Sequence, residues 1–234
     1  MGERLDKFLA SQGLGTRKEV GKLIRSGAVL VNGAPQRDPG AKVEPGADRV
    51  TAQGEEIRYQ EFLTIMLNKP AGVLSATEDR RQKTVLDLLP EGLRRRGLFP
   101  AGRLDKDTTG LLLITDDGEL AHKMLSPKSH VYKQYRAQLD APVEEADIQA
   151  FAAGVAWEGE QYAPARLWVE QDPRAAFVEI REGRFHQVKR MFQARGKTVL
   201  QLKRLKIGGL WLDSTLQEGA CRLLAPEEIQ SIFH

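Results

Sequence analysis

The sequence predicts an α+β fold with two domains, a small one over residues 1–60 and a larger one over residues 61–234. Two observations lead to this prediction. Helical and strand-like segments are interspersed, and the later strands are short, which favours a mainly antiparallel, mixed sheet with flanking helices. A polar stretch at residues 58–61 separates a helix pair with short strands from a new apolar strand that begins at Phe62.

The chain opens with two predicted amphipathic helices. Apolar residues recur at helical spacing within residues 4–10, and residues 11–15, which contain two glycines, end the first helix. Thr16 is placed to cap the second helix, because Glu19 follows three residues later as a capping-box partner. A Ser-Gly pair ends that helix. The inward apolar positions of the two helices are Leu5, Phe8, Leu9, Val20, Leu23 and Ile24.

Short strands follow the helix pair. Residues 28–33 are predicted to form a strand that enters a turn, and residues 42–50 a turn and another strand. This order of helix, turn, helix and small strands resembles the S4 RNA-binding domain. The resemblance rests on residues 4–9, 16–17, 24–27 and 29–33.

The resemblance to the S4 domain implies that basic side chains of the two helices contact RNA phosphates. Such contacts supply affinity and little sequence information. An ordinary amphipathic helix pair is the alternative interpretation. The residues expected to contact RNA are Arg4, Lys7, Arg17, Lys18 and Arg25.

The larger domain begins with a strand over residues 63–72 that ends in a proline-glycine loop. Residues 76–96 are charged and irregular, except for a short helix expected over residues 85–89. A longer amphipathic helix is expected over residues 144–154. Further strands are expected over residues 135–139, 166–170 and 177–180.

The composition is that of an ordinary globular protein, with 41% hydrophobic residues. No apolar run approaches membrane-spanning length and no signal-peptide core opens the chain, so a soluble cytoplasmic protein with no membrane partner is expected. Cys221 is the single cysteine, which excludes an internal disulfide and cysteine-based zinc sites. It is expected to be a packed core thiol.

Charge is unevenly distributed, although the net charge is only +3. Basic residues dominate residues 181–206, where Glu182 is the only acid. Acidic residues dominate residues 140–172, where Arg166 is the only base. Such segregation predicts one side that faces a polyanion and another that faces solvent. A solvated basic helix is the alternative for residues 181–206.

The segment 101–115 carries the strongest chemical signal. Asp105 lies beside Arg103, close to glycines and the pair Thr108 and Thr109, and an apolar, strand-like run follows. This arrangement would hold one carboxylate rigidly at the edge of a cleft, as a nucleophile or general base requires. A backbone cap or turn is the alternative.

Two metal sites are further alternatives. A calcium loop is disfavoured, because its middle would be the apolar run 111–115 and its last ligand an aspartate instead of the longer glutamate. Its ligands would be Asp105, Asp107, Thr109, Gly110 and Asp116. A metal-dependent nuclease would need clustered carboxylates. These would be Asp105, Asp107, Asp116 and Asp117.

Segments along nearly the whole chain resemble the RNA pseudouridine synthases in their order and spacing. The central one, residues 102–110 (GRLDKDTTG), is followed by residues 115–118 and 126–127, a form that resembles the RsuA-like branch, which modifies ribosomal RNA. The other matching segments are residues 67–72, 132–135, 182–192 and 206–210.

The resemblance implies an isomerase that breaks the N-glycosidic bond of a uridine, turns the base over and rejoins it through carbon, with no cofactor and no metal. Asp105 would be the nucleophile, and Tyr135 would stack on the target base. Lys189, where many relatives have arginine, would pair with Asp105 and keep it ionised, and Arg103 is a second counter-charge. His186 would be structural.

The implied substrate is a uridine extruded from ribosomal RNA. The 16S RNA is the expected target, in a pre-ribosomal particle or partly assembled subunit, and the protein is expected to be monomeric. Arg184 and Arg190 would contact the RNA as well. The alternatives are a synthase that acts on 23S RNA and a non-catalytic RNA-binding factor for ribosome assembly.

Overall fold

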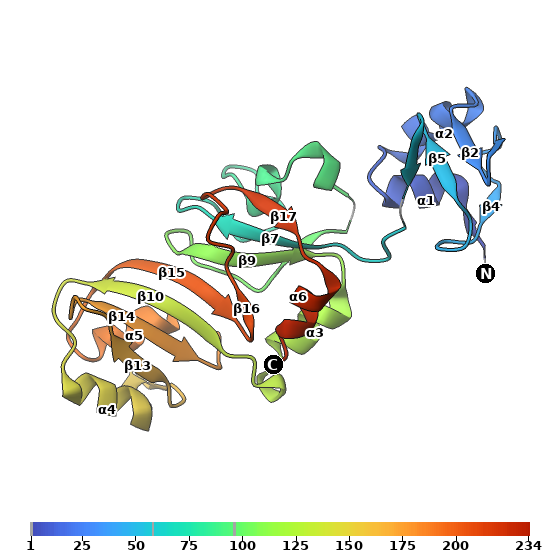
Figure 1. The fold of residues 1–234 in the computed structure, drawn as a ribbon. Coiled ribbons are helices and arrows are strands. Elements are labelled where there is room, and N and C mark those ends of the chain that lie inside the picture. The colour runs from blue at the N-terminus through green and yellow to red at the C-terminus, as the bar shows by residue number, and fades with distance from the viewer. Residues whose placement is uncertain (1, 58, 96) are drawn as a thin grey trace. The chain divides into compact units, whose positions relative to one another are not determined.

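Figure 1 shows the computed structural model, which describes residues 2–57, 59–95 and 97–234 and divides into two compact units. The first unit ends at Phe62 but also contains Leu89–Leu98, and the second contains Leu63–Leu88 and Phe99–His234. The sequence did not predict that Leu89–Leu98 belongs to the first unit. Arg58 of the predicted polar stretch and Arg96 of the predicted irregular stretch lie outside the described residues. The domain boundary between residues 60 and 61 stays a prediction.

The first unit packs two helices against short strands. The predicted cap of α2 is confirmed, because the Thr16 hydroxyl accepts from the Glu19 amide and the Glu19 carboxylate accepts from the Thr16 amide. Four strands form an antiparallel sheet in the order β3-β2-β5-β6, and β1 pairs with β4. The elements are β1 (Glu3–Arg4), α1 (Leu5–Ser11), α2 (Arg17–Arg25), β2 (Val29–Val31), β3 (Ala34–Pro35), β4 (Lys42–Val43), β5 (Val50–Ala52), β6 (Glu55–Ile57) and the 3₁₀ helix η2 (Glu91–Leu93).

The core of the first unit contains the predicted apolar positions, except that Leu23 is only partly buried against it. Leu89–Leu98 is fastened to this unit by Arg95. The Arg95 guanidinium donates to the backbone carbonyls of Ser11, Gln60 and Glu61. In each of these contacts the two residues are 34 or more positions apart in the sequence, so the local sequence pattern does not predict them.

The second unit is built on a nine-stranded sheet in the order β13-β14-β10-β15-β9-β7-β17, with β16 beside β15 and β8 beside β9. The strands are β7 (Thr64–Lys69), β8 (Phe99–Ala101), β9 (Thr109–Thr115), β10 (Lys133–Leu139), β13 (Arg166–Val169), β14 (Ala175–Ile180), β15 (Val199–Ile207), β16 (Leu210–Trp211) and β17 (Cys221–Leu223). Neighbours are antiparallel except β9 with β15. The predicted α+β class with a mainly antiparallel, mixed sheet is therefore confirmed.

Helices flank this sheet, and none in the described part of the chain is long and apolar enough to cross a membrane. They are α3 (Gly118–Leu125), α4 (Glu145–Ala153), α5 (Gln187–Gln193), α6 (Pro226–Ser231) and the 3₁₀ helices η1 (Val85–Leu88) and η3 (Pro127–Ser129). A separate hairpin pairs β11 (Ala156–Trp157) with β12 (Glu160–Gln161). The sequence did not predict α3, α6 or β15.

The sheet has two halves that meet along its single parallel pair. Only two residue pairs join them, Lys203 with Thr109 and Arg204 with Gly110. Gly110 has a φ of +98°, and a Cβ there would collide with the backbone of Arg204. Glycine is therefore required at this position for the two halves to approach. The segment that contains Asp105 leads directly into this junction, because it precedes β9.

Some charges of the two blocks pair with one another in space. Asp147, in the acidic block, is only 1% exposed and forms ion pairs with Arg195 at 2.9 Å and Lys197 at 2.8 Å. Arg184, in the basic block, pairs with Glu160. The polyanion-facing side expected from residues 181–206 stays a prediction, although these three basic side chains are engaged in ion pairs. The helix alternative is wrong in part, because α5 is followed by the strand β15.

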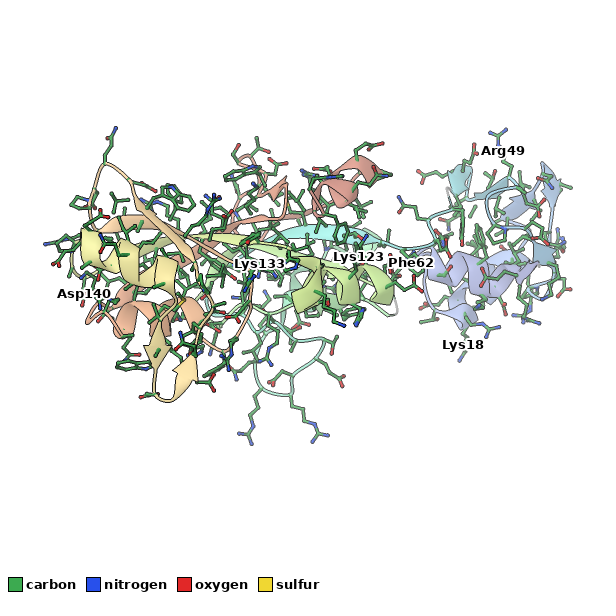
Figure 2. All side chains as sticks on the ribbon, turned by 90° about the horizontal axis from the view of Figure 1, so that it is seen from below. Lys18, Arg49, Phe62, Lys123, Lys133 and Asp140 are labelled. Carbon is green, nitrogen blue, oxygen red and sulfur yellow. The ribbon has the colours of Figure 1, made fainter. Side chains whose placement is uncertain are left out.

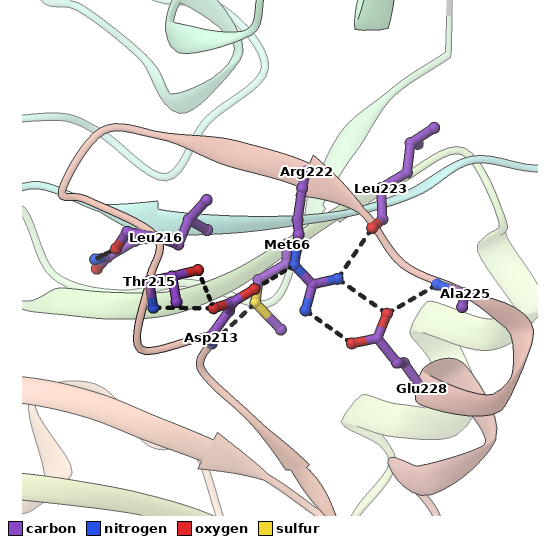
Figure 3. A network of polar contacts seen from close by, with 9 residues as sticks. Met66, Asp213, Thr215, Leu216, Arg222, Leu223, Ala225 and Glu228 are labelled. Atoms are coloured by element: carbon purple, nitrogen blue, oxygen red, sulfur yellow. Dashed lines mark hydrogen bonds and ion pairs between the residues drawn. The ribbon is translucent and has the colours of Figure 1, made fainter.

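A network around Arg222 closes the β17 edge of the sheet (Figure 3). The guanidinium donates to Asp213 at 2.7 Å and to both carboxylate oxygens of Glu228 at 2.9 and 2.8 Å. Hydrogen bonds from Thr215, together with Arg222, lower the pKa of Asp213 to about 2. The network ties β17 to α6 and to the segment after β16. Cys221 lies next to it, half-buried, and burial raises the pKa of its thiol.

Candidate active site

Asp105 lies in the loop that joins β8 to β9, and its side chain is 26% exposed. Backbone and side-chain hydrogen bonds hold this loop in place. The Thr108 amide donates to the Asp105 carbonyl at 3.1 Å, and the Gly72 amide donates to the Lys106 carbonyl at 2.7 Å. The Ser75 hydroxyl accepts from the Leu104 amide at 3.1 Å and donates to the Leu104 carbonyl at 2.9 Å. A carboxylate fixed in this way is preorganised for chemistry.

A fully buried lysine lies beneath the same loop. The Lys69 ammonium donates to the carbonyls of Pro70 at 3.0 Å, Lys106 at 3.2 Å and Thr108 at 2.9 Å. Burial lowers its pKa to about 8, against the opposing influence of Asp107 and Asp105. Lys69 therefore fastens the end of β7 to the Asp105 loop. Lys69 belongs to residues 67–72, one of the segments that resemble the pseudouridine synthases, but no role was predicted for it from the sequence.

Two side chains, those of Lys189 and His186, approach the Asp105 carboxylate. Lys189 Nζ lies 3.5 Å from one oxygen, and His186 Nε2 lies 3.5 Å from the other. Lys189 is closer to Asp107, at 2.6 Å, and its hydrogen bond lowers the pKa of that carboxyl. The predicted counter-charge is thus near Asp105 but is shared with a second carboxylate. Asp107 is a member of this site that the sequence considered only as a metal ligand.

His186 has a left-handed backbone conformation, with φ +51°, and directly precedes α5. Left-handed conformations are uncommon outside glycine, and they gather at functional sites. Its ring stacks on Phe185 with 3.7 Å between centroids. Gln187 braces the turn, since it accepts from the Arg184 amide and donates to Glu182, both at 3.1 Å. The structural role of His186 stays a prediction.

A pocket of about 60 Å³ contains Asp105 and receives residues from both halves of the sheet. Tyr135 lines it from β10 and is only 8% exposed. The Arg204 guanidinium lies 6.0 Å from the Tyr135 ring centroid and donates to its hydroxyl at 3.5 Å. The pocket residues are Arg103, Leu104, Asp105, Thr108, Tyr135, Ile180, Gly183, Arg184, His186, Gln187, Val188 and Leu202.

Arg103 lines this pocket but is not among the described cations within 4.0 Å of Asp105. The expected pairing of Arg103 with Asp105 is therefore absent among the described ion pairs, and the Arg103 side chain is exposed. The second side chain near Asp105 is that of His186 instead. His186 and Asp105 are 81 positions apart in the sequence. Only folding, which brings the start of α5 to the loop before β9, places the imidazole near Asp105.

The two metal alternatives fail on geometry. Asp105 and Asp107 precede β9, whereas Asp116 and Asp117 follow it. A strand rises about 3.3 Å per residue, so the seven residues of β9 separate the two pairs by roughly 20 Å. Asp117 caps α3 instead, because its carboxylate accepts from the Leu120 amide at 2.9 Å. These four carboxylates cannot share one metal ion.

Most side chains of the first unit that are predicted to contact RNA form ion pairs or hydrogen bonds within that unit. Asp6 accepts from Arg4 at 3.0 Å and from Arg17 at 2.9 Å, and these bonds, led by that from Arg4, lower its pKa to about 2. Lys7 pairs with Glu3. Figure 2 shows Lys18 of α2 and Arg49 on opposite sides of this unit. Arg25 donates to the Gly21 carbonyl within α2.

The two predicted RNA contacts of the second unit lie near aromatic rings. The Arg184 guanidinium lies 5.5 Å from the Tyr162 ring centroid and donates to the Gln161 carbonyl at 2.8 Å. Arg190 lies 5.1 Å from the Phe185 ring centroid and donates to the Tyr162 hydroxyl at 3.4 Å. Both have aromatic neighbours; Arg184 lines the pocket, whereas Arg190 is not among its described lining residues.

A larger cavity of about 690 Å³ lies elsewhere in the second unit. It is lined by residues of three stretches, 129–132, 164–166 and 232–234, together with Ala152, Glu179, Lys206 and Gly208. It contains none of the predicted site residues, and the ion pair on its wall, between Arg166 and Glu179 at 3.3 Å, joins the neighbouring strands β13 and β14. The smaller pocket is therefore the better candidate for the chemistry, despite its size.

Comparison with known proteins gives consistent matches. The family model described as RNA pseudouridylate synthase matches residues 63–194, and the S4 domain model matches residues 3–48. An uncharacterized RNA pseudouridine synthase of Bacillus subtilis, YtzG, is 46% identical over 97% of this chain and 96% of its own length. The ribosomal small subunit pseudouridine synthase A of Escherichia coli is 42% identical over 98% of this chain and 99% of its own.

A solved structure described as a pseudouridylate synthase is 39% identical and has a TM-score of 0.67, over 98% of this chain and 99% of that one. The family match begins at Leu63, where the second unit begins, and the S4 match lies within the first unit. The fold, the matched segments and the near-complete coverage agree. The chain belongs to the RNA pseudouridine synthases, a family of isomerases, and carries an N-terminal S4 domain.

Proposed function

We propose that this protein isomerises one uridine of small-subunit ribosomal RNA to pseudouridine, with Asp105 as the nucleophile. One observation carries the catalytic part of the proposal. A carboxylate on a braced loop lies 3.5 Å from a lysine ammonium and 3.5 Å from a histidine imidazole, and it shares its pocket with an aromatic ring. Covalent catalysis requires a nucleophile of this kind, positioned and charge-balanced by its neighbours.

The reaction rearranges atoms that the uridine already contains. The glycosidic carbon–nitrogen bond breaks, the base turns over, and a carbon–carbon bond replaces it while the hydrogen at C5 leaves as a proton and another is gained at nitrogen. No redox partner or group donor is needed. Asp105 attacks, Lys189 balances its charge, and Tyr135 stacks on the base while it is free to turn.

The pocket must widen to admit its substrate, because ligand pockets for whole small molecules enclose roughly 300–1,000 Å³. The target base also has to leave its helical stack. Arg184, which lines the pocket, and Arg190 of α5 hold the flanking phosphates in this proposal, and the S4 domain adds phosphate contacts through Arg4, Lys7, Arg17, Lys18 and Arg25.

The choice of small-subunit RNA is supported by the printed name of the Escherichia coli relative, which covers nearly the whole of this chain. We propose the 516-type uridine of 16S RNA as the target, in a partly assembled subunit. A monomer is sufficient for this activity, since every group that the mechanism uses lies in a single chain.

Mapping of pseudouridines in ribosomal RNA tests the proposal. A strain that lacks the protein should lose one modified uridine from 16S RNA, and the wild-type gene should restore it, whereas a gene encoding Asp105→Asn should not. Loss of a 23S position instead would move the substrate to the large subunit. An unchanged map, or full rescue by the Asn variant, would refute the enzymatic proposal.

A further inference from the structure

We propose that the Thr108 hydroxyl hydrogen-bonds the uridine nucleotide in the Asp105 pocket and is a specificity-determining contact of this enzyme. The inference rests on the proposed function, since it requires a uridine in that pocket. Thr108 lines the same pocket as Asp105 and Tyr135 and is only 2% exposed. Among the described residues, its hydroxyl has no hydrogen-bond partner.

Thr108 differs in this respect from the other buried threonines that the structure describes. The Thr64 hydroxyl lies 3.2 Å from that of Thr115, which donates to the Leu63 carbonyl at 2.6 Å. The Thr84 hydroxyl bonds to Asp87 at 3.0 Å. Each of these hydroxyls is satisfied within its own neighbourhood, as is normal for buried polar groups. A valine would fill the space of Thr108 without a buried, unpaired hydroxyl.

The groups nearest to the Thr108 hydroxyl along the chain are already engaged. The Thr108 carbonyl accepts from Lys69 at 2.9 Å, and the Thr108 amide donates to the Asp105 carbonyl at 3.1 Å. The adjacent Thr109 hydroxyl donates to the Leu202 carbonyl at 3.5 Å. These bonds fix the backbone of Thr108 relative to Asp105. The hydroxyl oxygen itself is buried, so a substrate would supply its partner once the pocket that Thr108 lines widens.

A bound uridine supplies such a partner. Its base and ribose carry both donors and acceptors, and a hydroxyl can do either, because it is one donor and an acceptor with two lone pairs. A site whose buried polar group is paired only by the correct substrate discriminates against ligands that leave it unpaired. The two other unpartnered buried atoms in the described chain, Asn68 Oδ1 and Arg204 Nη2, belong to residues that do not line this pocket.

The test compares Thr108→Val with Thr64→Val in the full-length protein. The assay measures tritium release from a 16S RNA transcript labelled at C5 of uridine, and melting temperatures are measured on the same preparations. Thr108→Val should melt at or above the wild-type temperature, because it removes an unpaired buried hydroxyl. Its kcat/KM should fall about tenfold. Thr108→Ser, which keeps the hydroxyl, should recover most of that loss.

Thr64→Val is the control, because it removes a paired hydroxyl at the far end of β7. It should melt at a lower temperature and keep its kcat/KM per folded molecule. A wild-type kcat/KM for Thr108→Val overturns the inference, as does a lower melting temperature with unchanged kcat/KM per folded molecule. If Asp105→Asn turns over normally, the proposed function fails; if it is inactive and Thr108→Val is normal, only this inference fails.

Discussion

Asp105 and Asp147 each lie between two basic side chains in the second unit, but these side chains are held very differently. At Asp147 the carboxylate is 1% exposed, and Lys197 and Arg195 lie at 2.8 and 2.9 Å. At Asp105 it is 26% exposed, and Lys189 and His186 both lie at 3.5 Å. The first arrangement is closed and has no room for another molecule. The second balances charge while it leaves the carboxylate open to a pocket.

The same difference extends to the surroundings of the two carboxylates. Asp147 also accepts from the Glu144 amide at 2.9 Å, so helix α4 begins on it. Burial raises the pKa of Asp147, yet the hydrogen bonds from Lys197, Glu144 and Arg195 outweigh it and lower the pKa. Asp147 is thus saturated with partners that stabilise the fold. At Asp105 the bracing bonds involve the backbone of the loop, which leaves the carboxylate available for chemistry.

The strongest test of this comparison exchanges each aspartate for asparagine. Asp105→Asn should lower turnover by at least about 10³-fold, as removal of a nucleophile does, and barely change the melting temperature. Asp147→Asn should lower the free energy of unfolding by about 3–5 kcal/mol, because the buried Lys197 and the half-buried Arg195 lose their charged partner. Turnover per folded molecule should stay near wild type. Tritium release and thermal melts on the same samples measure both quantities, and a stable, inactive Asp147→Asn would break the comparison.

The cations provide a second, smaller test. Lys189→Gln should lower turnover by about 10²-fold, since it removes a preorganised charge beside the reacting carboxylate. Its stability should change little, because Lys189 pairs with the largely exposed Asp107. Lys197→Gln should do the reverse, with an unfolding free energy lower by about 1–3 kcal/mol and near-normal turnover. Equal effects of the two variants on turnover would contradict the distinction.

A third test concerns RNA binding and compares a cation of the first unit that has no described ion pair with one that has. Lys18 is exposed on α2 and forms no ion pair among the described residues, whereas Arg49 pairs with Glu56 at 3.1 Å. Lys18→Ala should reduce the slope of log Kd against log salt by roughly 0.7–0.9, the value for one phosphate contact. Arg49→Ala is the matched control and should leave the slope unchanged. Fluorescence anisotropy over a salt series measures it, and identical slopes for both variants would remove Lys18 from the RNA surface.

The last test concerns the pH dependence of stability and Lys69, the lysine beneath the Asp105 loop. Folding lowers the pKa of Lys69 from 10.5 to about 8. Between pH 8 and 10.5 the unfolded chain therefore holds a proton that the native protein has lost, so this group makes stability rise with pH across that window. Below pH 8 it adds no pH dependence. Urea unfolding at several pH values should give a more positive slope for wild type than for Lys69→Met. Parallel curves would show that Lys69 titrates normally.

Much of the architecture follows from interactions within a few residues of chain. The cap of α2 needs only Thr16 and Glu19, which are three positions apart. The apolar run before Asp116 is buried inside the sheet as β9. The Asp105 motif is equally local, because its glycines, threonines and carboxylate adjoin. Such features can be predicted from a sequence, because the residues that cause them are neighbours in the chain.

The rest required the chain to fold. Lys189 reaches Asp107 across 82 residues, and His186 meets Asp105 only because the loop before β9 and the start of α5 converge at the junction of the two half-sheets. Some acidic and basic residues of the two charge blocks pair for the same reason: Coulomb energy depends on distance in space, and burial without a partner is costly for a charge. A run of like charges therefore marks where partners are needed, and the fold determines which charges pair, as where α4 carries Asp147 to Arg195 and Lys197.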